Sequence, residues 1–60
     1  MIIKYDKEAK ALYIYLADIP DGGVDHTEEL ILDTVMLDKD AQGVIVGIEV
    51  LGVEDIVYDG

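Results

Sequence analysis

Hydrophobic and polar positions alternate along most of this 60-residue chain, and short polar stretches separate the apolar runs. The longest apolar run covers residues 44–51, and its β-branched side chains stand two positions apart: Val44, Val46, Ile48 and Val50. Such side chains share one face of an extended chain and pack well on a pleated sheet. The run therefore predicts a β-strand, and the polar residues 38–43 before it predict a hairpin turn.

The N-terminal part of the chain predicts a first hairpin. Residues 2–5 and 11–16 are rich in β-formers, and the polar residues 6–10 separate them. If Tyr5 pairs with Leu12, the two faces of the hairpin differ in polarity. The apolar face then holds Ile3, Tyr5, Leu12, Ile14 and Leu16, and the other face holds Lys4, Tyr13 and Tyr15. The tyrosines are expected to half-bury their rings and keep their hydroxyls in water.

A second hairpin is predicted after a connection rich in turn formers. Residues 30–37 suit a strand, although an Asp25…Glu28 capping box is an alternative that would start a short helix. We expect Leu37 to lie opposite Val44, because this register gathers nearly all large apolar side chains on one face. That face holds Ile31, Val35, Leu37, Val44, Val46, Ile48 and Val50, and Asp33 interrupts it.

The two predicted turns resemble each other. Asp, Lys and Ala recur at matching positions of residues 6–14 and 38–46. An Asp that opens a turn accepts hydrogen bonds from backbone N–H groups further round it, so neither turn needs a ligand. We therefore predict a mainly β fold with one four-stranded antiparallel sheet, built from two hairpins in a single domain over residues 1–60. Residues 53–58 fit a short helical turn, which would make the fold α+β, or a short edge strand.

Composition restricts the function. Fourteen acidic residues against four basic ones give a net charge of −10, which repels phosphate and anionic lipid, so no nucleic acid or membrane partner is expected. The charge suits a basic protein partner or simply keeps the protein soluble. The absence of cysteine excludes disulfides and thiolate metal sites. Because no signal peptide and no bilayer-spanning apolar run are visible, we expect a soluble, cytoplasmic protein.

Two motifs occupy the predicted hairpins. They are Tyr5-Asp6-Lys7-Glu8-Ala9-Lys10-Ala11-Leu12-Tyr13-Ile14 and Gly43-Val44-Ile45-Val46-Gly47-Ile48-Glu49-Val50-Leu51. Together they make the chain, over about residues 2–51, resemble a family of short bacterial proteins, the domain of unknown function 2283. The resemblance implies a small β-rich domain, and it implies no activity, cofactor or substrate.

The second turn also matches the spacing of a calcium-binding loop, except at one position. The candidate ligands are Asp38, Asp40, Gln42 and Glu49. A calcium loop of this kind lies between helices, however, and a strand would carry Glu49 roughly 20 Å away from Gly43. The plain hairpin turn is therefore the preferred interpretation, and no metal or cofactor is expected.

Two other groups of side chains are candidates for chemistry. His26 with Asp25 and Glu28 is half of a metal or acid–base site, but zinc catalysis needs three protein ligands and the chain has no second His or Cys. Asp33 and Glu49 form a candidate carboxylate pair for glycoside or phosphate chemistry, but the predicted register puts them on opposite faces. Without a nucleophile–base set, the sequence favours a protein that is not an enzyme.

One four-stranded sheet leaves an apolar face that the remaining, mostly polar chain is too short to cover. We therefore expect a homodimer that stacks two sheets. The expected interface residues are Ile14, Leu16, Val35, Leu37, Val44, Val46, Ile48 and Val50. The function that follows is a self-associating or partner-binding module. The alternatives are an acidic inhibitor or antitoxin-like binder of a basic protein and, third, a small hydrolytic enzyme.

Overall fold

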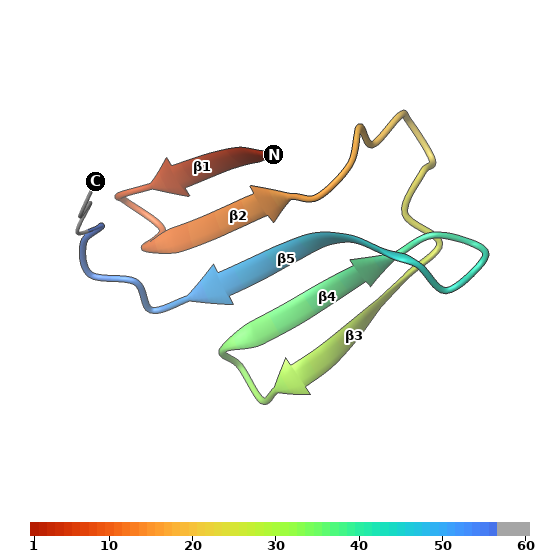
Figure 1. Ribbon diagram of the computed structural model, residues 1–60. Helices are drawn as coiled ribbons and strands as arrows, with labels where there is room; N and C mark the ends of the chain where they lie inside the picture. Colours follow the sequence, from red (N-terminus) through yellow and green to blue (C-terminus); the bar gives the residue numbers. More distant parts are fainter. Residues whose placement is uncertain (57–60) are drawn as a thin grey trace.

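The computed structural model describes residues 1–56, which form one antiparallel sheet of five strands in the order β1-β2-β5-β4-β3 (Figure 1). The strands are β1 (Ile2–Asp6), β2 (Ala11–Tyr15), β3 (His26–Ile31), β4 (Val35–Lys39) and β5 (Ile45–Leu51). The mainly β, antiparallel fold is confirmed, but the predicted number of four strands is wrong. Residues 1–56 contain no helix, so neither the helix expected from the Asp25…Glu28 capping box nor the α+β alternative is observed.

The additional strand arises because residues 30–37 are not one continuous strand. A turn between β3 and β4 interrupts them, and the Thr34 N–H donates to the Ile31 carbonyl at 3.0 Å. Asp33 lies in this turn with φ 56°, a left-handed conformation that Asp adopts more readily than most residues. The residue that interrupts the apolar alternation in the sequence therefore marks the turn.

The β1–β2 hairpin has the predicted register. Tyr5 lies opposite Leu12. Asp6 opens the turn of residues 7–10, and its Oδ1 accepts the N–H groups of Glu8 at 3.0 Å and Ala9 at 3.1 Å. These hydrogen bonds confirm the expected turn, because the Asp side chain replaces backbone partners that the chain reversal removes.

The predicted register of β4 and β5 is wrong. Leu37 lies opposite Ile48, not opposite Val44. The two registers differ by an even number of residues, so the apolar side chains of the two strands still share a face. A bulge then places Ile45 opposite Lys39, and Val44 precedes β5 instead of continuing its apolar alternation.

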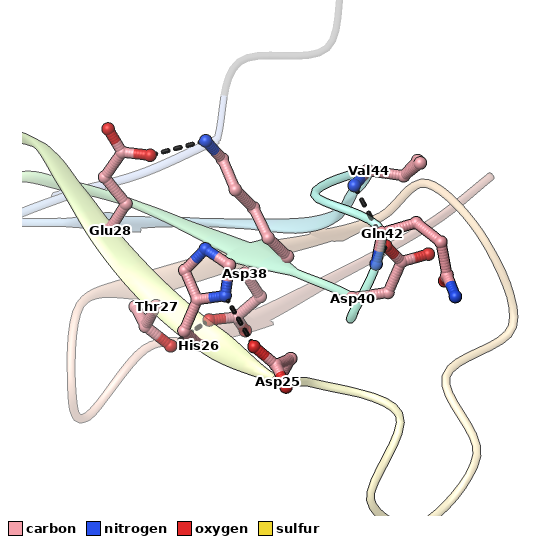
Figure 2. A network of polar contacts seen from close by, with 9 residues as sticks. Asp25, His26, Thr27, Glu28, Asp38, Asp40, Gln42 and Val44 are labelled. Carbon is pink, nitrogen blue, oxygen red and sulfur yellow. Dashed lines mark hydrogen bonds and ion pairs between the residues drawn. The ribbon is translucent and has the colours of Figure 1, made fainter.

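The β4–β5 turn is tighter than expected, and it explains the shift. The Asp40 N–H donates to the Val44 carbonyl at 2.9 Å, and Gly43 adopts φ 83°, which favours glycine. Asp40 Oδ1 accepts the N–H groups of Gln42 and Val44, both at 2.9 Å (Figure 2). Asp40 thus supports this turn, whereas Asp38, which the sequence comparison aligned with Asp6, lies on β4.

β5 is the central strand, with β2 on one side and β4 on the other. The connection of residues 16–25 therefore runs from the interior of the sheet to its β3 edge (Figure 1). Pro20 and Val24 of this connection line a shallow hollow together with Tyr13 and Tyr15. The connection thus packs beside the tyrosines and leaves the apolar side chains of the sheet open.

Residues 52–56 follow β5 without forming a helix or a strand. The Val53 N–H donates to the Lys10 carbonyl, and the Val53 carbonyl accepts the Tyr5 hydroxyl at 2.6 Å. The helical turn or edge strand expected over residues 53–58 is absent from residues 53–56, and residues 57 and 58 lie outside the described part of the chain. The start of the tail is therefore fastened to the β1–β2 hairpin.

The sheet has two distinct faces, which follow from the cross-strand registers. The apolar face comprises Ile3, Tyr5, Leu12, Ile14, Val35, Leu37, Val46, Ile48 and Val50. The tyrosine face comprises Lys4, Tyr13, Tyr15, Met36, Asp38, Gly47 and Glu49. Figure 1 shows a single layer of strands. Over the described residues, only Val46 is a buried apolar side chain.

Candidate functional site

The tyrosine face carries a chain of hydrogen bonds that links three strands. The Tyr13 hydroxyl of β2 donates to Asp38 Oδ2 of β4 at 2.5 Å. The Thr27 hydroxyl of β3 donates to the other carboxylate oxygen, Asp38 Oδ1, at 2.6 Å (Figure 2). Because β5 lies between β2 and β4, the Tyr13 side chain must cross the central strand to reach its partner.

Gly47 provides the space for this crossing. It lies opposite Tyr15 on one side and Asp38 on the other, and it is buried although it has no side chain. A Cβ at this position would overlap the hydroxyl oxygen of Tyr13. Glycine is therefore required here for the close approach of an aromatic side chain to the backbone.

The environment of Tyr13 keeps its hydroxyl protonated. Burial raises the pKa of Tyr13 well above its ordinary value of 10.0, and the hydrogen bond to Asp38 and the negative charges of Asp38 and Glu49 raise it further. A tyrosine held in this way donates a hydrogen bond but does not accept a proton at neutral pH. We therefore assign Tyr13 a structural role, because its hydroxyl is bonded to Asp38. The half-burial expected for this residue is observed.

Tyr15 completes this surface. Its ring centroid lies 4.6 Å from that of Tyr13 with the planes tilted by 60°, and Lys4 Nζ lies 5.4 Å from the Tyr15 centroid. Both geometries are favourable for aromatic side chains. The tyrosine face is thus stabilised by contacts within the chain.

The calcium candidates do not converge on a common point. Asp38 is bonded to Tyr13 and Thr27, and Asp40 is bonded to the backbone of its own turn. Glu49 lies on β5 opposite Tyr13 and Met36. Across residues 1–56, no three His, Asp or Glu side chains are grouped closely enough to hold a metal ion.

The acid–base candidates are also separated. His26 Nδ1 lies 2.9 Å from Asp25 Oδ2, but the Glu28 carboxylate binds Lys39 Nζ at 2.5 Å instead (Figure 2). The hydrogen bond from Lys39 lowers the pKa of Glu28 below its ordinary value of 4.5. Asp33 lies in the β3–β4 turn, whereas Glu49 lies within the central strand, so the proposed carboxylate pair does not form.

The apolar face is not covered by a second layer of the described chain. Its central row runs across the sheet from Ile3 through Ile14 and Ile48 to Leu37. At its margins, Ile3 is 57% exposed and Ile31 is 54% exposed. Contiguous apolar surfaces are often sites of interaction in proteins.

Sequence reasoning found most of the apolar face but missed the hydrogen-bonded set. Tyr13, Asp38 and Thr27 come together only because β5 lies between β2 and β4, and that strand order was not predicted. The one local signal is Gly47, a glycine inside an otherwise β-branched strand, which often marks close backbone approach.

Fold and surface together define a small, single-layer antiparallel β protein with an open apolar face. The family model described as "Protein of unknown function (DUF2283)" matches residues 2–53, and the chain belongs to this family. The resemblance recognised in the two hairpin motifs is therefore confirmed. No curated protein and no solved structure matches the chain. Within the described residues, no helix is long and apolar enough to cross a membrane.

Proposed function

We propose that this protein is a non-enzymatic, self-associating module in which two copies stack their apolar faces to form a homodimer. The open apolar face carries the proposal. Val46, at 7% exposure, is the single apolar side chain of the described residues that is buried as in a protein core. Domains normally bury a sheet face against a second layer, and a second copy supplies that layer.

The size of the face suits such a dimer. The two longer dimensions of the molecule are 33 and 26 Å, which bound the sheet face. Each partner in a standard stable complex buries about 800 Å². The area of a rectangle with these sides is close to this value of about 800 Å². A two-fold stack that buries this area on each copy would therefore cover most of the apolar face.

The distribution of charge favours two copies that stack with the centres of their apolar faces in contact. The net charge of −10 makes two copies repel each other, and this repulsion is screened as ionic strength rises. The central row of the apolar face carries no charge, while the Glu28–Lys39 pair lies at the end of that row. We therefore expect association to strengthen with added salt.

The hydrogen bonds of the polar side chains support the proposal that the protein is not an enzyme. Tyr13, Asp38 and Thr27 are bonded to one another across the strands, and Asp6 and Asp40 are bonded to the backbone of their turns. These side chains stabilise the fold and are not free to act on a substrate.

Ile2 and Ile3 provide a matched test. They are neighbours on β1, they are 56% and 57% exposed, and alternation puts them on opposite faces of the sheet. In an isolated chain, Ile2→Glu and Ile3→Glu should therefore have similar effects. In the proposed dimer, Ile3→Glu places a charge inside the interface, whereas Ile2→Glu does not.

The measurement is sedimentation equilibrium at tens of micromolar protein, combined with chemical denaturation. Wild-type protein and Ile2→Glu should be dimers, and Ile3→Glu should dissociate and unfold at lower denaturant concentration. A wild-type chain that is a stably folded monomer, or two variants that behave alike, would contradict the proposal.

A further inference from the structure

The two edges of the sheet carry different charges. β1 forms one edge and β3 forms the other. Lysines accompany the first edge: Lys4 on β1, and Lys7 and Lys10 in the turn that follows it. Acids accompany the second edge: Asp25, Glu28, Glu29 and Asp33, with no lysine between them. The β1 edge thus carries the residue type that most often protects edge strands, and the β3 edge does not.

The β3 edge is accessible along its length. All residues of His26–Ile31 are exposed. An edge strand directs alternate backbone N–H and C=O groups away from its sheet, where they are free to pair with another strand. The regular register with β4 extends from His26 to Glu29, and a bulge follows. Beyond it, large apolar side chains remain in the open: Leu30 at 61%, Ile31 at 54% and Leu32 at 76% exposure.

We propose that the β3 edge binds an extended, basic segment of a partner protein by adding it to the sheet as a sixth strand. Backbone hydrogen bonds would hold such a segment, and side chains would select it. Glu28 and Glu29 are successive residues of β3, so their side chains point to opposite faces. Glu28 is already paired with Lys39, so Glu29 is the acid that basic residues on one face of the added strand would meet. Apolar residues of that strand would contact Leu30 and Leu32.

A second copy of this chain fits the edge poorly. Two β3 edges would bring Glu28 and Glu29 against the same acids of the other copy, which is unfavourable on directly paired strands. Pairing of β3 with the β1 edge of another copy is a head-to-tail contact, which leads to open filaments, and each added copy brings a charge of −10. A basic partner avoids both problems. The β3 edge also remains free when two apolar faces stack, so this proposal is independent of the homodimer.

A synthetic strand tests the proposal directly. The probe is a fluorescent peptide of about eight residues with alternating lysine and valine, the usual length of a strand. The control peptide has the same sequence with alternate backbone amides methylated, which preserves its charge but removes the hydrogen bonds along one edge. At an ionic strength of 0.15 M, where the screening length is about 8 Å, we expect saturable binding of the probe and binding at least tenfold weaker for the control.

Two charge reversals locate the contact on the protein. Glu29→Lys changes β3, and Glu8→Lys makes the same change of net charge in the β1–β2 turn. Both positions are exposed. Glu29→Lys loses a long hydrogen bond of 3.4 Å from the Asp33 N–H, and neither change should unfold the protein. We expect Glu29→Lys to weaken peptide binding about tenfold and Glu8→Lys to change it far less, since one acts at the contact and the other only through screened charge.

Amide hydrogen exchange identifies the surface. Addition of the peptide should slow exchange in β3 and leave the β1 edge unchanged. Equal losses with Glu29→Lys and Glu8→Lys, equal affinity of the methylated peptide, protection confined to the apolar face, or no saturable binding would each overturn the proposal. Sedimentation of the protein without peptide reports on the homodimer separately, so the failure of one proposal is distinguishable from the failure of the other.

Discussion

The two faces of the sheet are stabilised in different ways. On the tyrosine face, Tyr13 spans the central strand and is bonded to Asp38, which also holds Thr27. On the apolar face, the described chain offers no second layer, and side chains such as Ile3 stay more than half exposed. The difference shows that one face is completed by hydrogen bonds within the chain, while the other is left without a covering layer by residues 1–56.

The largest effect is expected from a charge at the buried position of the apolar face. Val46→Asp would place a carboxylate at a position that is 7% exposed, which leaves an unpaired charge without water. We expect the variant to be largely unfolded, because a chain of this size has few kcal/mol of stability in reserve. Far-UV circular dichroism measures the loss of the sheet.

Val44→Asp is the control for this change. It introduces the same charge, but Val44 precedes β5 and is 56% exposed. The control should keep a wild-type spectrum. Equal loss of structure in both variants would mean that added charge, and not its place on the apolar face, causes the unfolding.

A smaller but specific effect is expected on the tyrosine face from Gly47→Ala. The added methyl group would overlap the Tyr13 hydroxyl, so the ring must move and lose its bond to Asp38. We expect a loss of about 1–3 kcal/mol, typical of overpacking. Chemical denaturation measures it. In a Tyr13→Ala background the clash is absent, so the same Gly47→Ala change should destabilise little, and additive effects would contradict the geometry.

The next largest loss of stability is expected from removal of the Tyr13 hydroxyl group. Tyr13→Phe removes the part-buried bond to Asp38 and should cost about 1–3 kcal/mol, because a hydrogen bond to a charged group is lost. Tyr15→Phe removes a hydroxyl from the neighbouring, stacked ring and serves as the control. Chemical denaturation near neutral pH should therefore rank wild type and Tyr15→Phe above Tyr13→Phe.

The same pair of variants has a distinct pH dependence. The pKa of Tyr13 is higher in the folded protein than its ordinary value of 10.0, so the folded state retains a proton that the unfolded state loses. The stabilisation of the folded state by this proton is complete below about pH 10, and it is lost as pH rises toward the pKa of Tyr13 in the folded protein. The stability of wild type and Tyr15→Phe should therefore fall more steeply above pH 10 than that of Tyr13→Phe. Parallel curves would contradict the assignment.

The smallest effect is expected at the rim of the apolar face. Lys39 lowers the pKa of Glu28, so the folded state favours the ionised carboxylate. The stabilisation is present above the ordinary value of 4.5 and is lost as pH falls through the lowered pKa. Glu28→Gln should therefore be slightly less stable than wild type at neutral pH and equal to it in acid. Thermal unfolding at both pH values measures this, with Glu8→Gln as the exposed control.

Local sequence patterns predicted the first hairpin correctly, because alternation and an Asp at the turn both pointed to the same register. The second hairpin contains two aspartates, Asp38 and Asp40, either of which fits the start of a turn, and the prediction used the wrong one. The predicted apolar face was still largely right, because the error in the β4–β5 register was an even number of residues and kept each side chain on its side of the sheet. Asp33 was recognised as an interruption but not as a turn, since no glycine or proline accompanies it.

The tyrosine face could not be predicted in the same way. Its hydrogen bonds join Tyr13 to a residue two strands away, and that neighbourhood depends on which strands pair over long sequence distances. Strand order is decided by the packing of the whole sheet and has no local signature. The composition of the apolar face was foreseeable because it depends mainly on alternation along each strand.

The position of β5 also has a consequence for how the protein folds. This last strand of the described chain pairs with β2 on one side and β4 on the other, and so joins the β1–β2 hairpin and the β3–β4 hairpin into one sheet. During synthesis both hairpins leave the ribosome before it, and each presents an unpaired inner edge until residues 45–51 emerge. Closure of the sheet must then await contacts between distant parts of the sequence, such as Leu12 with Val50, which are slow to form. The nascent chain is therefore most prone to aggregation just before its central strand arrives.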